Sequence, residues 1–191
     1  METVLGIIVG IGLAASCGFR VFVPMFVMSV AVKAGQLSVA ENWHWIGSWP
    51  ALSAFGVATV IEIIAFYIPW IDHLLDTIAT PSSVVAGIIA TAACVSEMSP
   101  LLQWSTAIIA GGGIAAAVQS STVLVRGTST VTTGGLGNFV VSTIEWMLSL
   151  FLSVLAIVVP IVAGLLLVLM AGGVLWILLR RRARRLEAAR G

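Results

Sequence analysis

The stretch from Gly12 to Pro24 reads Gly-Leu-Ala-Ala-Ser-Cys-Gly-Phe-Arg-Val-Phe-Val-Pro, and it places Arg20 inside an otherwise apolar segment. At about 1.5 Å of rise per helical residue, the guanidinium would lie far from either end of a membrane-spanning helix. An arginine at mid-bilayer costs roughly 2.5 to 3.5 kcal/mol and normally faces a partner, a backbone carbonyl or a water-filled cavity. The sequence therefore predicts a polar site around Arg20.

Composition sets the class of protein. Apolar residues make up 60% of the chain and charged residues 9%, and the mean hydropathy is +1.14. These values exclude a soluble domain with a single core and predict an all-α integral membrane protein. Most of the Lys and Arg residues lie in the last twelve positions, 180–191, directly after an apolar segment. This basic tail predicts a cytoplasmic anchor against anionic headgroups, and no nucleic-acid binding.

Six membrane spans are predicted, at about 4–32, 51–70, 80–95, 101–126, 138–157 and 159–179. The first is too long for a hydrocarbon core of about 30 Å, so it must tilt, protrude or bend. Gly18 and Pro24 flank Arg20 and are the obvious places for a break. Two interpretations stay open: a helix broken at a transport site, or a long tilted helix whose Arg20 pairs structurally with a carboxylate.

Short similarities in the same order link the two halves of the chain. Three pairs carry them: Gly12–Ser16 with Gly113–Ala117, Thr59–Glu62 with Ser142–Glu145, and Val85–Ile88 with Val162–Leu165. They predict two three-helix repeats, 1–97 and 98–179, followed by the tail 180–191. Because three is odd, the repeats would be inverted, as in many secondary transporters.

Three ionisable residues fall within predicted spans. Glu62 and Glu145 lie near the middle of corresponding helices, and Arg20 is the expected counter-charge for at least one of them. In the second repeat, Gln119, Ser120 and Ser121 stand roughly where Arg20 stands in the first. They are predicted to bind substrate, or alternatively to hydrogen-bond between helices.

Three further segments have two interpretations each. Asp72 and Asp76 would share a helix face, either as an acidic mouth at the cytoplasmic side or as a connector in the headgroup zone. The Ser/Thr/Gly-rich segment 127–137 is a flexible loop or a cradle for an anion at a helix N-terminus. Tryptophans in 43–49 form an interfacial belt or a stacking surface.

The basic tail also predicts the orientation. Six spans would place both termini in the cytoplasm and the Trp-rich segment outside. The cytoplasmic side would then hold the acidic mouth, Arg126 and the Ser/Thr/Gly-rich segment.

Several motifs together resemble a family of small bacterial inner-membrane proteins catalogued only as a domain of unknown function. They are Gly18-Phe19-Arg20 with Pro24, Trp49-Pro50-Ala51-Leu52, Glu62, Ile68-Pro69 with Asp72 and Asp76, and Thr133-Gly134-Gly135-Leu136-Gly137-Asn138 leading to Glu145. The sequence departs from the pattern at Phe66-Tyr67, where members tend to carry Asp-Lys, and at Thr80, where an Arg is common. The resemblance implies the fold and a bacterial inner-membrane location, and it gives no activity.

The first functional hypothesis is a secondary transporter or lipid-type translocase with its site between the repeats. Arg20 would hold an anionic substrate group, and Glu62 and Glu145 would carry coupling protons. The second is a structural or accessory subunit whose buried charges lock helices together or dock a partner. The chain lacks the usual hydrolase, metal and phosphate-loop motifs, so we expect no enzyme, no catalytic residue, no metal and no cofactor. The expected partners are the lipid bilayer, an anionic or amphiphilic small substrate, and further copies of the chain or a larger membrane complex.

Overall fold

The computed structural model describes residues 2–68, 71–169, 172–173 and 180, and the secondary structure of these residues is helical. In chain order the elements are α1 (Glu2–Cys17), α2 (Phe22–Lys33), η1 (Glu41–Gly47), α3 (Trp49–Ala65), α4 (Ile71–Cys94), α5 (Pro100–Thr106), η2 (Ala107–Gly112), α6 (Gly113–Thr133) and α7 (Asn138–Val158). The predicted all-α class is confirmed.

Within the described residues, three helices are long and apolar enough to cross a membrane: Thr77–Cys94, Pro100–Thr133 and Asn138–Val158. A fourth is added if η1 and α3, which meet at 60°, count as one span. These helices indicate a membrane protein, but six spans in a 3+3 repeat are not confirmed. Of the predicted sixth span, Pro160–Leu169 is a helix; most of its remainder and of the basic tail lies outside the described residues.

Helix α1 runs antiparallel to α4. A Cβ atom added at Gly6 would touch the Cys94 carbonyl oxygen, and one added at Gly87 would lie 3.3 Å from the Ala14 side chain. The first residues of α1 therefore lie beside the last residues of α4. Thr3 Oγ1 also donates a 3.0 Å hydrogen bond to Glu97, just after α4 ends.

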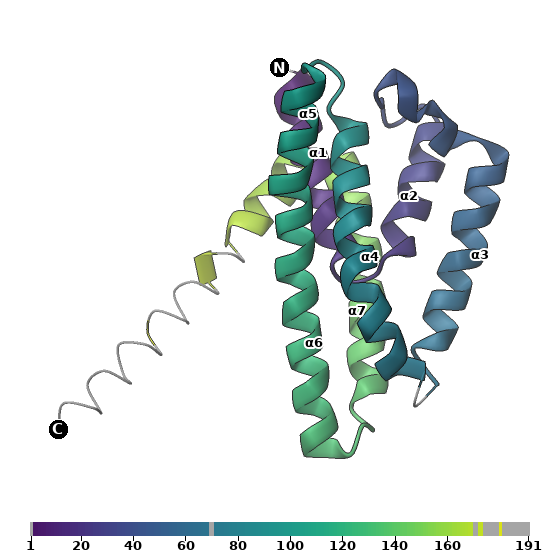
Figure 1. Ribbon diagram of the computed structural model, residues 1–191, viewed down its shortest axis with the longest axis vertical. Helices are drawn as coiled ribbons and strands as arrows, with labels where there is room; N and C mark the ends of the chain where they lie inside the picture. The colour runs from purple at the N-terminus through teal and green to yellow at the C-terminus, as the bar shows by residue number, and fades with distance from the viewer. Residues whose placement is uncertain (1, 69–70, 170–171, 174–179, 181–191) are drawn as a thin grey trace.

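Helix α2 brings the chain back to the same end. After it, the Ala40 amide donates a 2.9 Å hydrogen bond to the Ala93 carbonyl near the end of α4. The first helix and α2 thus form a helical hairpin, visible in Figure 1, whose tip is Gly18–Val21. Of the two interpretations of this segment, the structure shows the helix broken beside Arg20. A single membrane crossing by the whole segment is not confirmed.

Local hydrogen bonds explain the hairpin. The amides of Gly18, Phe19 and Arg20 bond back to carbonyls of residues 14–16, which closes α1. The backbone amides at the start of α2 have no acceptor within the helix, and two of them donate hydrogen bonds to the Glu62 carboxylate. Pro24 lies in this first turn, where a missing N–H costs little.

The hairpin changes the expected topology. The start of α1 and the Trp-rich segment lie at one end of the molecule, and the turn between α6 and α7 lies at the other (Figure 1). The predicted placement of the N-terminus on the same membrane side as the Ser/Thr/Gly-rich segment is not confirmed. Which end faces the cytoplasm stays a prediction.

Two helix boundaries also differ from expectation. The Ser/Thr/Gly-rich segment is mostly helical, because α6 continues to Thr133 and only Gly134–Gly137 form a turn. Its Thr hydroxyls donate to carbonyls three or four residues earlier, which satisfies them inside a helix. Helix α4 likewise begins at Ile71, not near Thr80, and continues through Pro81.

The glycines 111–113 allow α4 and the π-helical segment η2 to pack closely. A Cβ atom added at Gly111 would touch Thr91 Oγ1 and lie 2.6 Å from the Gly87 carbonyl oxygen. One added at Gly113 would meet nothing within 4 Å. A Cβ atom added at Gly112 would lie 3.0 Å from Ile88 Cγ1, so the first two glycines of the triplet lie in the close contact.

Candidate functional site

Arg20 lies at the tip of the hairpin and is only 2% exposed. Its Nη2 atom is 3.1 Å from Glu145 Oε2 on α7 and donates to the Ser142 carbonyl at 3.3 Å. The expected counter-charge is thus Glu145. An arginine buried in a helical membrane bundle is stabilised by such a carboxylate and would be costly without it.

A second arginine contacts the same carboxylate. Arg126 on α6 donates from Nε to Glu145 Oε1 at 3.0 Å, and its Nη2 atom pairs with Oε2. Both residues are 4% exposed. Glu145 therefore bridges two guanidinium groups that come from the hairpin tip and from α6.

Phe66, directly after α3, packs against both arginines. Its ring centroid is 3.7 Å from Arg20 Cζ and 4.2 Å from Arg126 Cζ. Guanidinium groups stack favourably on aromatic faces, so Phe66 helps to hold both in place. We call Arg20, Arg126, Glu145 and Phe66 the arginine cluster.

Glu62 lies at the start of α2, a contact that the sequence did not predict. Its two carboxylate oxygens accept hydrogen bonds from the amides of Val21 at 2.8 Å and Phe22 at 3.0 Å. The first amides of a helix have no partner within it, and the helix dipole favours a negative charge there. Glu62 thus caps α2 from the neighbouring helix α3. Across the site, Glu62 and Glu145 balance the formal charges of Arg20 and Arg126.

The buried face of α7 is mainly polar. Of its seven buried residues, five are polar: Asn138, Ser142, Glu145, Ser149 and Ser153. Residues at spacings of three and four share one helix face. Helix α7 therefore presents polar groups to the protein interior and apolar groups, such as Phe151, outward.

Polar side chains also line the contact between α6 and α7, from the cluster to the turn that joins the two helices. Asn138 Nδ2 donates to Thr130 Oγ1 at 3.1 Å, and Thr130 Oγ1 donates to the Arg126 carbonyl at 2.9 Å. Near the turn, the Gly137 amide donates to Thr133 Oγ1. We call Arg126, Ser129, Thr130, Thr133, Asn138 and Ser142 the α6–α7 seam.

The cluster lies closer to the α6–α7 turn than to the N-terminal end. At 1.5 Å per residue it is about 24 Å from the start of α1 and about 10 Å from the start of α7. The expectation that Arg20 lies far from either end of a helix is not met, because the segment is broken and Arg20 lies between the end of α1 and the start of α2. The hairpin, by turning back, carries Arg20 to the polar part of α6 and α7.

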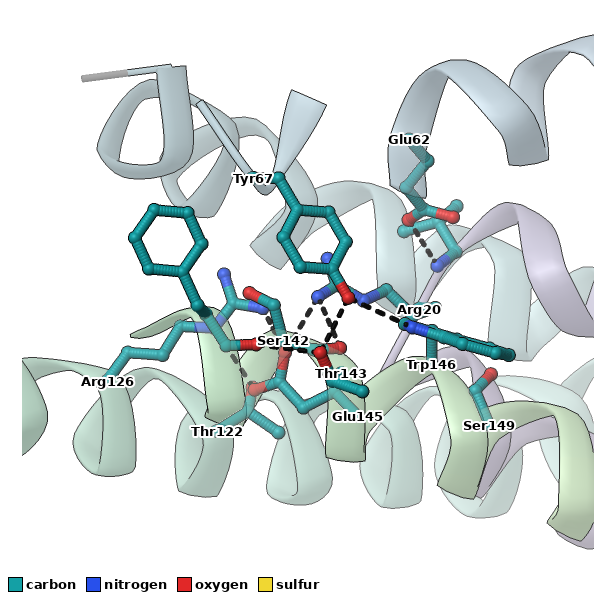
Figure 2. Close-up of polar contacts among 12 residues, drawn as sticks. Arg20, Glu62, Tyr67, Thr122, Arg126, Ser142, Thr143, Glu145, Trp146 and Ser149 are labelled. Atoms are coloured by element: carbon teal, nitrogen blue, oxygen red, sulfur yellow. Dashed lines mark hydrogen bonds and ion pairs between the residues drawn. The ribbon is translucent and has the colours of Figure 1, made fainter. Parts of the chain in front are cut away.

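Tyr67 fixes the end of α3 to α7. Its hydroxyl lies 2.6 Å from Thr143 Oγ1 and accepts a 3.2 Å hydrogen bond from Trp146 Nε1, as Figure 2 shows. Both Phe66 and Tyr67 thus support the site, at the positions where the sequence departs from the pattern it resembles.

Two of the predicted substrate-binding residues, Ser120 and Ser121, face away from the protein interior. Gln119 is buried on α6, but Ser120 and Ser121 are exposed and donate to carbonyls of their own helix. Successive helical residues point in different directions, so this run cannot line one site. The backbone of Asp72 and Asp76 belongs to the start of α4, and their side chains lie outside the described residues.

Arg126, Phe66 and Ser142 are the site residues that sequence reasoning missed. Polar residues at 126, 130 and 133 and at 138, 142 and 145 are spaced by three or four, as on two facing helices. This signal is visible once the segment 127–133 is treated as helix.

An apolar groove of about 350 Å³ lies beside the hairpin tip. It is lined by Val21 at the tip, Phe22 and Met25 on α2, Phe55 on α3, and Val85 among the residues on α4. Val21 and Phe22 directly follow Arg20, so the groove adjoins the arginine cluster through the backbone.

No curated protein and no solved structure matches the chain. A family model described as a domain of unknown function (DUF4126) matches residues 7–180. This match covers the hairpin, the cluster and the α6–α7 seam, and therefore the chain belongs to the DUF4126 family.

Proposed function

We propose that the protein is a membrane carrier, a secondary transporter or lipid-type translocase, for an anionic or amphiphilic solute. The observation that carries this proposal is the hairpin of α1 and α2, whose tip holds Arg20 against Glu145 inside the helical bundle. Discontinuous helices that end within the membrane are a recurring way for transporters to place charged groups at a substrate site.

The ionisable residues take separate roles in this proposal. Arg20 binds the anionic group of the solute. Glu145 is the resting counter-ion of Arg20, and it accepts a coupling proton when the solute replaces it. Glu62 holds the start of α2, so a change in its protonation would weaken the two hydrogen bonds that fix the hairpin tip.

The groove beside the tip favours a solute with an apolar part. Its lining is predominantly apolar, and it begins at the residues that follow Arg20. A solute with an anionic group at the cluster could place an alkyl chain there, as an amphiphile requires.

A second candidate is a structural or accessory subunit. It is favoured by the burial and pairing of the charges, since Arg20, Arg126 and Glu145 are each at most 4% exposed and contact one another. Buried pairs of this kind can lock a single helix arrangement without moving a solute.

Flux in reconstituted vesicles separates the two candidates. Vesicles with wild-type protein should transport a fluorescent anionic phospholipid, or protons followed by a pH-sensitive dye, faster than empty vesicles. Glu145→Gln should abolish the difference, and Glu97→Gln, which alters an exposed carboxylate after α4, should not. Equal rates in wild-type and empty vesicles, with a stoichiometric membrane partner in pull-downs, would support the accessory role.

A further inference from the structure

Glu145 occupies a position where two cations converge. Its Oε1 atom accepts from Arg126 Nε, and its Oε2 atom pairs with the Nη2 atoms of both Arg20 and Arg126. Planar guanidinium groups recognise carboxylate and phosphate oxygens in this forked way. The two arginines thus form a receptor for an oxyanion, and a side chain of the protein fills it.

A hydroxyl beside this receptor has no partner. Ser142 is 0% exposed, and its Oγ atom makes no hydrogen bond within the described residues. Figure 2 shows Ser142 between Arg20 and Arg126. Because buried hydroxyls are nearly always paired, an unused donor at this place indicates a group that the cluster receives from outside.

The polar α6–α7 seam extends from the turn to the receptor. The seam runs from Thr133 and Asn138 at the turn to Arg126, a distance of about 10 Å along either helix. Ser129, which faces this seam, has a second buried hydroxyl without a partner within the described residues. Hydroxyls without a partner along this contact can donate hydrogen bonds to an anion that moves through it.

We infer that an oxyanion, the carboxylate or phosphate group of a solute, exchanges with Glu145 between Arg20 and Arg126. Ser142 donates a hydrogen bond to it, and the α6–α7 seam is its route from the end of the molecule that holds Gly134–Gly137. The inference rests on the proposed function, because it names the ligand class, the second arginine and the access side of the same site.

Anion-dependent unfolding of the purified full chain tests this exchange. In zwitterionic detergent, the Tm is measured with sodium phosphate or sodium acetate against sodium chloride at equal ionic strength. Glu145→Gln removes the carboxylate that competes with the added anion. The concentration of phosphate or acetate that gives half of the maximal Tm rise, the half-effect concentration, should therefore be at least tenfold lower for this variant than for wild type. At about 100 times the Kd, the Tm of this variant should rise by about 5 to 10 °C.

Two serine substitutions, one at the site and one away from it, provide a matched comparison. Ser142→Ala removes a group with no partner in the resting site, so the protein should fold normally while its half-effect concentration rises several-fold. Ser120→Ala, on the exposed face of α6, should leave it unchanged. This comparison holds even if Glu145→Gln does not fold.

Nanodiscs distinguish the two sources of the anion. If the Tm of Glu145→Gln is higher in nanodiscs that contain phosphatidylglycerol than in nanodiscs of phosphatidylcholine alone, the anion is a lipid headgroup. If the Tm rises when inorganic phosphate is added, the anion is a soluble one. No effect of phosphate, acetate or phosphatidylglycerol beyond chloride, together with equal behaviour of the two serine variants, would overturn the inference. Anion binding without flux would instead overturn only the proposed carrier function.

Discussion

The guanidinium of Arg20 and the carboxylate of Glu145 meet at 3.1 Å, although one lies near the start of the chain and the other on α7. The contact joins the hairpin tip to the long helices of the second half. It also brings Arg126 and Phe66 into one cluster. The stability of the bundle and its proposed site therefore depend on the same carboxylate.

Replacing this carboxylate should destabilise the protein strongly. Glu145→Gln leaves two buried guanidinium groups without their counter-ion, and breaking such a buried pair costs about 3 to 5 kcal/mol. Glu97→Gln, at an exposed position, should change the free energy of unfolding by less than about 0.5 kcal/mol. Denaturant titration in detergent, without added oxyanions, measures both. Equal stability of the two variants would contradict the geometry of the cluster.

Glu62→Gln should loosen the hairpin tip specifically. An amide side chain has one acceptor oxygen instead of two, so one of the Val21 and Phe22 amides loses its bond. A buried donor left unsatisfied costs about 1 to 3 kcal/mol. Hydrogen exchange should accelerate at these two amides and stay unchanged at the start of α7. Unchanged exchange at the tip would show that another group caps α2.

Two neighbouring glycines should respond differently to the same substitution. Gly111→Ala forces a Cβ against Thr91 and the Gly87 carbonyl, and overpacking of this kind costs about 1 to 3 kcal/mol. Gly113→Ala meets open space and should be neutral or stabilising by up to about 1 kcal/mol. Thermal unfolding of the two variants gives the comparison. A larger loss for Gly113→Ala would contradict the packing of η2 on α4.

If the hairpin of α1 and α2 enters and leaves the membrane on one side, cysteine labelling should show it. Thr3→Cys and Ser38→Cys should react with an impermeant maleimide from one side of the membrane, and Leu136→Cys from the other. The native Cys17 and Cys94 are buried and provide a low background. Labelling of Thr3→Cys and Ser38→Cys from opposite sides would mean that α1 and α2 cross the membrane as one span.

The sequence was sufficient to predict the class of protein and the need for a negative group near Arg20. An apolar stretch with one arginine requires such a partner whatever the fold. It could not select Glu145 over Glu62, because that choice depends on the direction of the chain after Gly18. The length of the first segment fits a tilted helix as well as a hairpin, and the decision comes from a distant contact, the capping of α2 by Glu62.

The role of Arg126 was hidden for a local reason. Seven residues of low helix propensity, Gly127–Thr133, follow it and are typical of a loop. In the structure their hydroxyls bond to the helix backbone, and the helix continues to the turn. Propensity is a weak guide where packing against a neighbouring helix stabilises the segment.

The most direct test of the central claim is lipid and proton flux in vesicles containing Arg20→Gln, with Lys33→Gln as the matched control. Lys33 stacks over Trp49 at the opposite end of the hairpin, so its loss removes a positive charge without touching the cluster. We expect wild type and Lys33→Gln to move the same probe at similar rates, and Arg20→Gln to fall to the rate of empty vesicles while remaining folded. Flux in Arg20→Gln equal to that of wild type would contradict a carrier site at Arg20.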